Sequence, residues 1–185
     1  LMHPAWSIIF FTSISGLGLG LAGLIVLGLL DLSLFSHLLI ASSAVFGLIG
    51  AGLLSSTLHL GHPERAWRAL SQWRSSWLSR EGVLAVLVLA SLGCWFLFTL
   101  FFGPPPLWCG ILILLMIVAT VYATSMIYGS LKTVACWHHP LTPVCYLMFS
   151  ACGGSVASLT MLALFGQPTP EMFTEITLAF LVGAW

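Results

Sequence analysis

Long uninterrupted apolar runs dominate this sequence. Five of them occupy residues 5–30, 36–60, 80–102, 107–131 and 142–165, and a sixth begins near residue 174. A bilayer core needs roughly 20 apolar residues per helix, and backbone groups in lipid must bond within their own segment. Because the runs show no two-residue alternation, they predict helices. We expect an all-α, polytopic transmembrane helical bundle with five full helices and the start of a sixth.

Charged residues make up only 5% of the 185 residues, and hydrophobic residues make up 59%. Soluble domains carry about 25% charged residues, so this chain cannot cover a globular surface in water. Basic and acidic residues number five each, which indicates no nucleic-acid partner. The chain ends inside an apolar run. We therefore expect residues 1–185 to be one transmembrane anchor domain that is truncated at its C-terminus.

The connection after the second run differs from the others because it holds four of the five basic residues. Apolar residues recur there at helical spacing, with polar residues between them. This pattern predicts an amphipathic segment lying in the membrane interface over residues 62–78. The alternative is an ordinary loop with a solvated basic face. The four basic residues are Arg65, Arg68, Arg74 and Arg80.

Crossing parity assigns most polar groups to one face of the membrane. If every run crosses the bilayer, the connections after the second and fourth helices lie on the same side as the N-terminus. That face then holds the arginine segment, Lys132, His138 and His139. The opposite face has few polar residues, namely Asp31, His37, Glu171 and Glu175.

Glu81 and His59 flank the arginine segment on that face. Carboxylates near a bilayer are costly and often functional, so Glu81 is a candidate proton acceptor. The alternative is a first-turn glutamate behind Ser79 as the N-cap, which the helix dipole favours. For His59, a satisfied interfacial histidine is the alternative to a hydrogen-bonding role near physiological pH. Together the two residues suit a hydroquinone, whose hydroxyls lose two protons as two electrons leave.

Haem and metal are not expected in this chain. A b haem with two histidine ligands needs both on facing helices at similar depth, yet none of the six histidines lies in the middle of an apolar run. A zinc site formed by Cys136, His138, His139 and Cys145 is the alternative, but their spacing matches no common zinc pattern. Electrons from a quinol would therefore leave through a redox centre on another subunit docked at this face.

Two segments resemble the signature of the dimethyl sulfoxide reductase anchor subunit family. One comprises residues 59–66 (His-Leu-Gly-His-Pro-Glu-Arg-Ala) followed by 76–81 (Ser-Trp-Leu-Ser-Arg-Glu). The other lies within residues 128–143 and holds Tyr128, Trp137 and Pro143. The resemblance covers most of the chain, from the first helix to the end of the fifth.

This resemblance implies a bundle of about eight helices and a role in electron transport during anaerobic respiration. It implies a bacterial cytoplasmic (inner) membrane protein that binds and oxidises menaquinol. The electrons would pass to a ferredoxin-like iron–sulfur subunit and then to a molybdopterin catalytic subunit. The family's quinol-site histidine and glutamate carry over to His59 and Glu81, and its anchors hold no haem.

Further roles follow from the same hypothesis. Arg65, Arg80 and Tyr128 would line or support the quinol site, and Arg68, Arg74 and Trp73 would meet headgroups or the iron–sulfur subunit. All five basic residues lie on the N-terminal face, which the positive-inside rule makes cytoplasmic. The resemblance makes the same face periplasmic, and we favour the resemblance.

Two other functions compete with quinol oxidation. A passive membrane anchor or assembly scaffold would use the arginine segment only for docking and would have no quinol site. A transporter would show polar groups near the midplane and broken helices, whereas these runs are unbroken at mid-depth.

Overall fold

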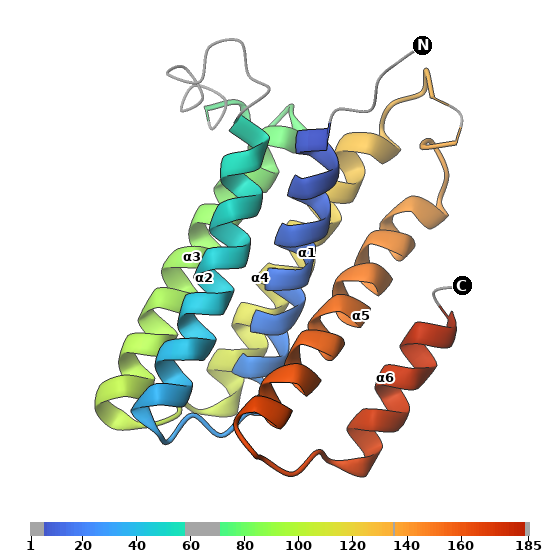
Figure 1. Cartoon of the computed structure of the whole chain (residues 1–185). Coiled ribbons are helices and arrows are strands. Elements are labelled where there is room, and N and C mark those ends of the chain that lie inside the picture. Colours follow the sequence, from blue (N-terminus) through green and yellow to red (C-terminus); the bar gives the residue numbers. More distant parts are fainter. Residues whose placement is uncertain (1–5, 58–70, 135, 184–185) are drawn as a thin grey trace.

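The structure, a computed structural model, describes residues 6–57, 71–134 and 136–183. Those residues form six α-helices and no strand (Figure 1), which confirms the predicted all-α bundle. The first five helices are long and apolar enough to cross a bilayer. The helices are α1 (Trp6–Val26), α2 (Phe35–Thr57), α3 (Trp77–Phe102), α4 (Leu107–Gly129), α5 (Leu141–Leu164) and α6 (Glu171–Gly183).

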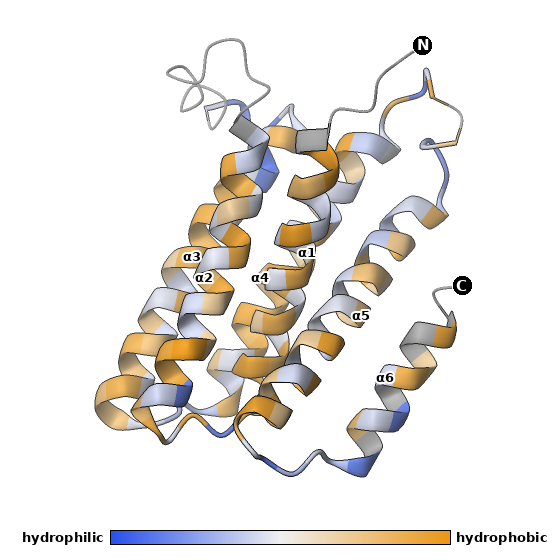
Figure 2. Cartoon of the chain, viewed as in Figure 1, coloured by the Kyte–Doolittle hydropathy of each residue, from blue (hydrophilic) through white to orange (hydrophobic). Residues whose placement is uncertain are grey.

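Hydrophobic residues dominate the middle of the helices, and the more hydrophilic residues gather toward the helix ends (Figure 2). Large side chains such as Phe101, Leu115 and Phe149 are more than half exposed. An exposed apolar band of this extent would be unfavourable in water and is favourable in lipid. The chain is therefore a multi-pass membrane protein.

Helix α1 lies at the centre of the bundle and packs against α2, α4 and α5. Helix α3 packs mainly against α4, while α6 contacts α5. The core fills the space between the first four helices, with a contribution from α5. Its most deeply buried apolar side chains include Leu21, Ile25, Val45, Ile49, Val88, Leu92 and Leu162.

Small residues let α1 and α5 approach closely. A methyl group on Gly20 would collide with the carbonyl group of Ser150, and one on Gly154 would collide with the backbone of Gly20. The Ser150 hydroxyl also donates a hydrogen bond to the carbonyl oxygen of Gly16 across this interface (2.7 Å). In lipid, the hydrophobic effect no longer drives helices together. Close packing and interhelical hydrogen bonds hold them together instead.

The ends of the helices confirm the predicted parity. The start of α1, the end of α2, the start of α3 and the α4–α5 connection lie at one end of the bundle (Figure 1). We call it the N-terminal end. The α1–α2, α3–α4 and α5–α6 connections lie at the opposite end.

At the opposite end, one side chain joins two connections that are far apart in the sequence. Gln167 accepts a hydrogen bond from the Asp31 amide (2.9 Å) and donates one to the Asp31 carbonyl oxygen (2.7 Å). His37 stacks on Phe165, with ring centroids 4.1 Å apart. The Asp31 carboxylate accepts a hydrogen bond from the Ser33 amide (2.9 Å), and this bond lowers the pKa of Asp31.

Helix α3 begins earlier than the sequence predicts, and this corrects one interpretation of Glu81. Ser76 is the N-cap residue, with extended backbone angles (φ −115°, ψ 127°), and no acidic residue lies in the first turn. Ser79 is therefore a buried helical residue and not a cap. Its hydroxyl has no hydrogen-bond partner among the described residues. Glu81 is the fifth residue of α3, so first-turn capping does not account for it.

The interfacial segment predicted over residues 62–78 is described only from residue 71 onward. Residues 71–76 form a tight turn in which the amides of Ser75 and Ser76 both donate to the Gln72 carbonyl oxygen (3.1 Å each). Residues 77 and 78 already belong to α3. The rest of the segment lies outside the described residues, so the amphipathic helix stays a prediction.

Candidate functional site

Glu81 is a buried carboxyl group inside the membrane-spanning bundle. It is 5% exposed, and its Oε1 accepts a hydrogen bond from the hydroxyl group of Thr124 on α4 (2.6 Å). Helices rise 1.5 Å per residue, which places Glu81 about 6 Å from the start of α3. Thr124 precedes Gly129, the last residue of α4, by five residues or about 7–8 Å. The pair therefore lies a little more than one helical turn inside the N-terminal end.

The hydroxyl group of Thr124 has two acceptors within reach but only one proton to donate. Besides Glu81, the carbonyl oxygen of Thr120 lies 3.1 Å away. When Glu81 is ionised, Thr124 donates to the carboxylate. When Glu81 is protonated, the acid donates to Thr124, and Thr124 donates to Thr120. Thr124 thus offers Glu81 one hydrogen bond in either protonation state.

A cavity of about 500 Å³ lies between α1, α4 and α5, and Thr124 forms part of its wall. Small-molecule sites commonly enclose roughly 300–1,000 Å³, so the space suits a ring-sized ligand. Glu81 itself does not line this cavity, so the Thr124 hydroxyl is the group that links the two. The other lining residues include Thr12, Ser15, Gly16, Val121, Tyr146, Phe149 and Ser150.

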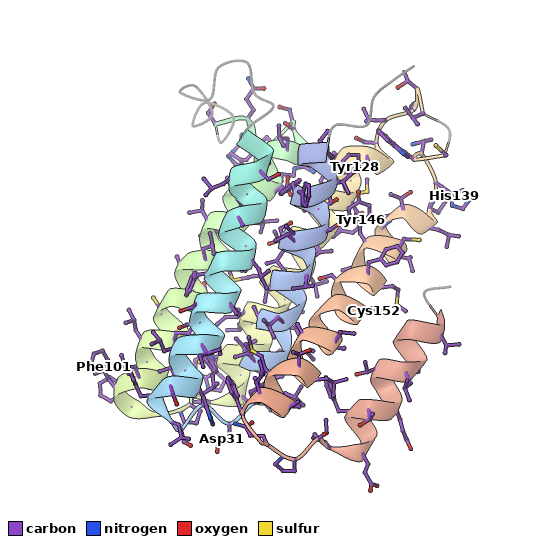
Figure 3. All side chains as sticks on the ribbon, viewed as in Figure 1. Asp31, Phe101, Tyr128, His139, Tyr146 and Cys152 are labelled. Atoms are coloured by element: carbon purple, nitrogen blue, oxygen red, sulfur yellow. The ribbon has the colours of Figure 1, made fainter. Side chains whose placement is uncertain are left out.

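Two tyrosines stand beside this cavity, toward the N-terminal end (Figure 3). Tyr128 of α4 stacks on Tyr146 of α5, with ring centroids 5.8 Å apart and planes inclined by 21°. Trp137, from the α4–α5 connection, meets Tyr128 edge-on at 5.5 Å. Tyr128 follows Thr124 by four residues on α4, so the stacked tyrosines lie one helical turn from the hydrogen bond between Thr124 and Glu81. The carboxyl group and the tyrosines therefore form one polar cluster.

A second cavity, of about 460 Å³, extends from this cluster toward the N-terminal end. Thr12 and Tyr146 line both cavities, so the two spaces adjoin along the same seam between α1, α4 and α5. The second cavity is also lined by Ile8, Ile9, Tyr128, Cys136, Trp137, His139, Leu141, Thr142 and Cys145.

Arg80 has a different environment from its neighbour Glu81. Its Nε donates to the carbonyl oxygen of Trp73 (2.9 Å) and its Nη2 to that of Arg74 (2.7 Å). The guanidinium group also lies over the ring of Trp77, 4.4 Å from the centroid. Arg80 thus holds the turn that precedes α3 and lines neither of the two cavities.

Trp73 and Arg74 are both exposed at the N-terminal end, where the sequence predicts a docking surface. With Arg80 they border a shallow apolar cavity of about 500 Å³ on the outside of α3. The guanidinium group of Arg74 lies 5.4 Å from the ring centroid of Trp73. The predicted partners of this surface stay a hypothesis.

The structure brings two of the predicted site residues, Glu81 and Tyr128, to the same end of the α3–α4 pair. Three others, His59, Arg65 and Arg68, lie outside the described residues. The pairing of His59 with Glu81 across a cleft therefore stays a prediction.

Thr124 and Tyr146 were missed by sequence reasoning. A signal for Thr124 was present, because Thr120, Thr124 and Tyr128 recur every four residues and so share one face of α4. Tyr146 gave no such signal, since it joins the cluster only through the packing of α5 against α4.

No three His, Cys, Asp or Glu side chains gather closely enough to hold a metal ion in the described part of the chain. The histidines of the alternative zinc set have other partners. His138 Nδ1 donates to the carbonyl oxygen of Gly129 (2.7 Å), and His139 Nδ1 accepts from the amide of Leu141 (3.2 Å). The four residues of the alternative zinc site are therefore not assembled around one point among the described residues.

Comparison with known proteins gives a consistent result. A family model described as DMSO reductase anchor subunit matches residues 2–184. The C subunit of the sulfite dehydrogenase of Allochromatium vinosum is 35% identical over 98% of this sequence and 62% of the relative. The C component of the anaerobic dimethyl sulfoxide reductase of Escherichia coli is 32% identical over 67% of this sequence and 45% of the relative. The protein thus spans less than two thirds of the length of these relatives, and no solved structure matches it.

Proposed function

Because the chain belongs to the DMSO reductase anchor subunit family, we propose that it binds a menaquinol-type hydroquinone and oxidises it. The observation that carries the proposal is Glu81, a buried carboxyl group hydrogen-bonded to Thr124 on the wall of a membrane-embedded cavity. Burial of a carboxyl group with a single hydroxyl partner destabilises the fold. Carboxyl groups retained inside spanning helices at this cost are commonly functional. A proton-accepting group beside a ring-sized cavity meets the needs of hydroquinone oxidation.

In this mechanism the hydroquinone occupies the seam between α1, α4 and α5 and loses two electrons and two protons. One hydroxyl group loses its proton to Glu81, the proton acceptor of the site. The other hydroxyl faces the N-terminal end, where His59 would hydrogen-bond it and its proton would leave. The two electrons pass to an iron–sulfur partner subunit, and both C–O bonds of the ring become C=O bonds. Tyr128 and Tyr146 would pack against the ring.

The partners follow from the family and from the exposed groups at the N-terminal end. A ferredoxin-like subunit would dock over Trp73 and Arg74 and would relay electrons to a molybdopterin catalytic subunit. The sequence predicts the same docking role for Arg68, which lies outside the described residues. Arg80 supports this surface by holding the turn between Trp73 and Trp77. Arg65 would line or support the quinol site. The chain would lie in a bacterial cytoplasmic membrane with its N-terminal end periplasmic.

The reverse direction of electron flow is the second candidate. The relative that matches 98% of this sequence is named as a subunit of a sulfite dehydrogenase. A dehydrogenase takes electrons from its substrate, so its anchor would pass them to a quinone. The same groups would then act in reverse, with Glu81 donating a proton to the quinone that is being reduced.

The test uses the full complex carrying Glu81→Gln. A dye assay first identifies the acceptor or donor of the catalytic subunit, and the quinol-coupled rate is then measured in both directions. We expect the quinol-coupled rate to fall by about 10²-fold or more, as for loss of a general base. The dye-coupled rate should stay unchanged, because dyes bypass the anchor.

Glu175→Gln is a suitable control, since Glu175 is an exposed acid at the opposite end of the bundle. Normal quinol coupling in an assembled Glu81→Gln complex would overturn the proposed role of Glu81. A wild-type complex that failed to bind a quinone analogue would instead make the chain a passive anchor without a quinol site.

A further inference from the structure

The position of Thr124 between Glu81 and the cavity has a chemical consequence. Glu81 is the proton acceptor of the proposed function, yet it does not line the 500 Å³ cavity in which a hydroquinone would fit. Thr124 lines that cavity and bonds Glu81 at 2.6 Å. A proton that moves from the cavity to Glu81 therefore meets the Thr124 oxygen first.

We propose that the Thr124 hydroxyl is a proton relay that connects a hydroquinone in the α1–α4–α5 cavity to Glu81. The inference rests on the proposed function and adds a residue that acts at the same site. Before transfer, Thr124 donates to the Glu81 carboxylate, and its oxygen lone pair accepts a hydrogen bond from the hydroquinone.

During transfer, two O–H bonds break and two form. The hydroquinone proton moves to Thr124 Oγ1 while the original proton of Thr124 moves to Glu81 Oε1. The hydroxyl group of Thr124 is regenerated, Glu81 becomes a neutral acid, and the electrons leave the ring for the iron–sulfur partner. Glu81 later releases its proton at the N-terminal end, about 6 Å away along α3.

The carbonyl oxygen of Thr120 gives the Thr124 hydroxyl an acceptor when Glu81 is protonated. After transfer, Glu81 donates to Thr124, so Thr124 must direct its own proton elsewhere. Thr120 offers a backbone acceptor at 3.1 Å. An unpaired hydroxyl proton in a low-dielectric interior is unfavourable, so this second acceptor keeps the relay reversible.

A neighbouring serine on α4 provides the matched control. The hydroxyl group of Ser125 is also buried, but it donates to the carbonyl oxygen of Tyr122 on its own helix (2.6 Å). Ser125→Ala removes a buried hydroxyl from the residue that follows Thr124 and leaves the relay groups in place. Any effect of simply losing a hydroxyl from α4 is therefore measured by Ser125→Ala.

The experiment compares Thr124→Val, Thr124→Ser and Ser125→Ala in the assembled complex. We expect Thr124→Val to lower kcat of the quinol-coupled reaction by about tenfold or more, with a smaller change in KM. Thr124→Ser restores a hydroxyl and should remain within about threefold of wild type. Ser125→Ala should match wild type, and dye-coupled rates should be unchanged in all three variants.

Reaction-induced infrared difference spectra give a second readout. The carboxylic C=O band that disappears in Glu81→Gln should be shifted in Thr124→Val and close to its wild-type position in Thr124→Ser and Ser125→Ala. If Glu81→Gln blocks quinol coupling while Thr124→Val leaves it normal, the relay is overturned and the proposed function survives. If Thr124→Ser is as slow as Thr124→Val in assembled complexes, hydroxyl chemistry is not the cause and the relay is overturned as well. If Glu81→Gln itself couples normally, the proposed role of Glu81 fails and the relay fails with it.

Discussion

Tyr128 and Tyr146 stack with their ring centroids 5.8 Å apart, and this contact joins α4 to α5 where the two cavities meet. Tyr146 belongs to the walls of both cavities, whereas Tyr128 lines only the one nearer the N-terminal end. The aromatic pair therefore shapes the seam that we assign to the hydroquinone.

Removal of the Tyr146 ring should weaken quinone binding. Stacked aromatic pairs contribute about 0.5–1.5 kcal/mol beyond their buried area, which corresponds to roughly 2- to 12-fold in affinity. We expect Tyr146→Ala to weaken binding of a fluorescent quinone analogue by about that factor or more. Tyr146→Phe keeps the ring and should bind nearly as wild type. Equal affinities for the alanine and phenylalanine variants would exclude Tyr146 from the binding site.

The close packing of α1 against α5 should depend on Gly20 more than on Gly16, one helical turn away. Gly20→Ala places a methyl group against the carbonyl of Ser150, and overpacking of this kind costs roughly 1–3 kcal/mol. Gly16→Ala adds the same methyl group where there is open space. Thermal unfolding in detergent should show a lower midpoint for Gly20→Ala and no such decrease for Gly16→Ala. A similar loss in both variants would contradict the observed packing.

Asp31 should make stability depend on pH at the opposite end of the bundle. The hydrogen bond from the Ser33 amide holds the pKa of Asp31 below its ordinary value of 3.8 in the folded chain. The stabilisation is therefore present at neutral pH and is lost as the pH falls through the lowered pKa. Wild type should unfold at a higher temperature than Asp31→Ala at neutral pH, and the difference should shrink in acid.

Asp31→Asn is the control for this measurement. Asparagine keeps an acceptor for the Ser33 amide but has no titrating carboxyl group. Its difference from Asp31→Ala should therefore stay constant over the same pH range. If the difference in unfolding temperature between wild type and Asp31→Ala also stayed constant, titration of Asp31 would not be its cause.

Arg80 should stabilise the turn before α3 without taking part in proton transfer. Its guanidinium group donates to the carbonyl oxygens of both Trp73 and Arg74, a fork that a lysine ammonium cannot reproduce. In Arg80→Lys we expect faster hydrogen exchange of the amides of Ser75 and Ser76 and a quinol-coupled rate within about threefold of wild type. Loss of coupling as large as that of Glu81→Gln, with unchanged exchange, would place Arg80 in the chemistry instead.

The sequence by itself determined the class of fold and the number of spanning helices. Run length and the need to pair every backbone group in lipid leave few alternatives to helices, so five spans and their parity could be predicted from the order of residues. Helix boundaries moved by up to four residues because local capping decides them. Gly28, with φ of +82°, closes α1 soon after Val26 although apolar residues continue to Leu30.

Only the tertiary structure decided what surrounds the predicted residues. Sequence reasoning selected Glu81 but left first-turn capping as an alternative, and the start of α3 at Trp77 removed that alternative. Neither the hydrogen bond from Thr124, 43 residues away, nor the placement of Tyr146 beside Tyr128 could be predicted. The length of an apolar run indicates that a helix lies in lipid. It does not specify which faces of two helices meet, since that depends on the packing of small residues such as Gly20 and Gly154 along the whole interface.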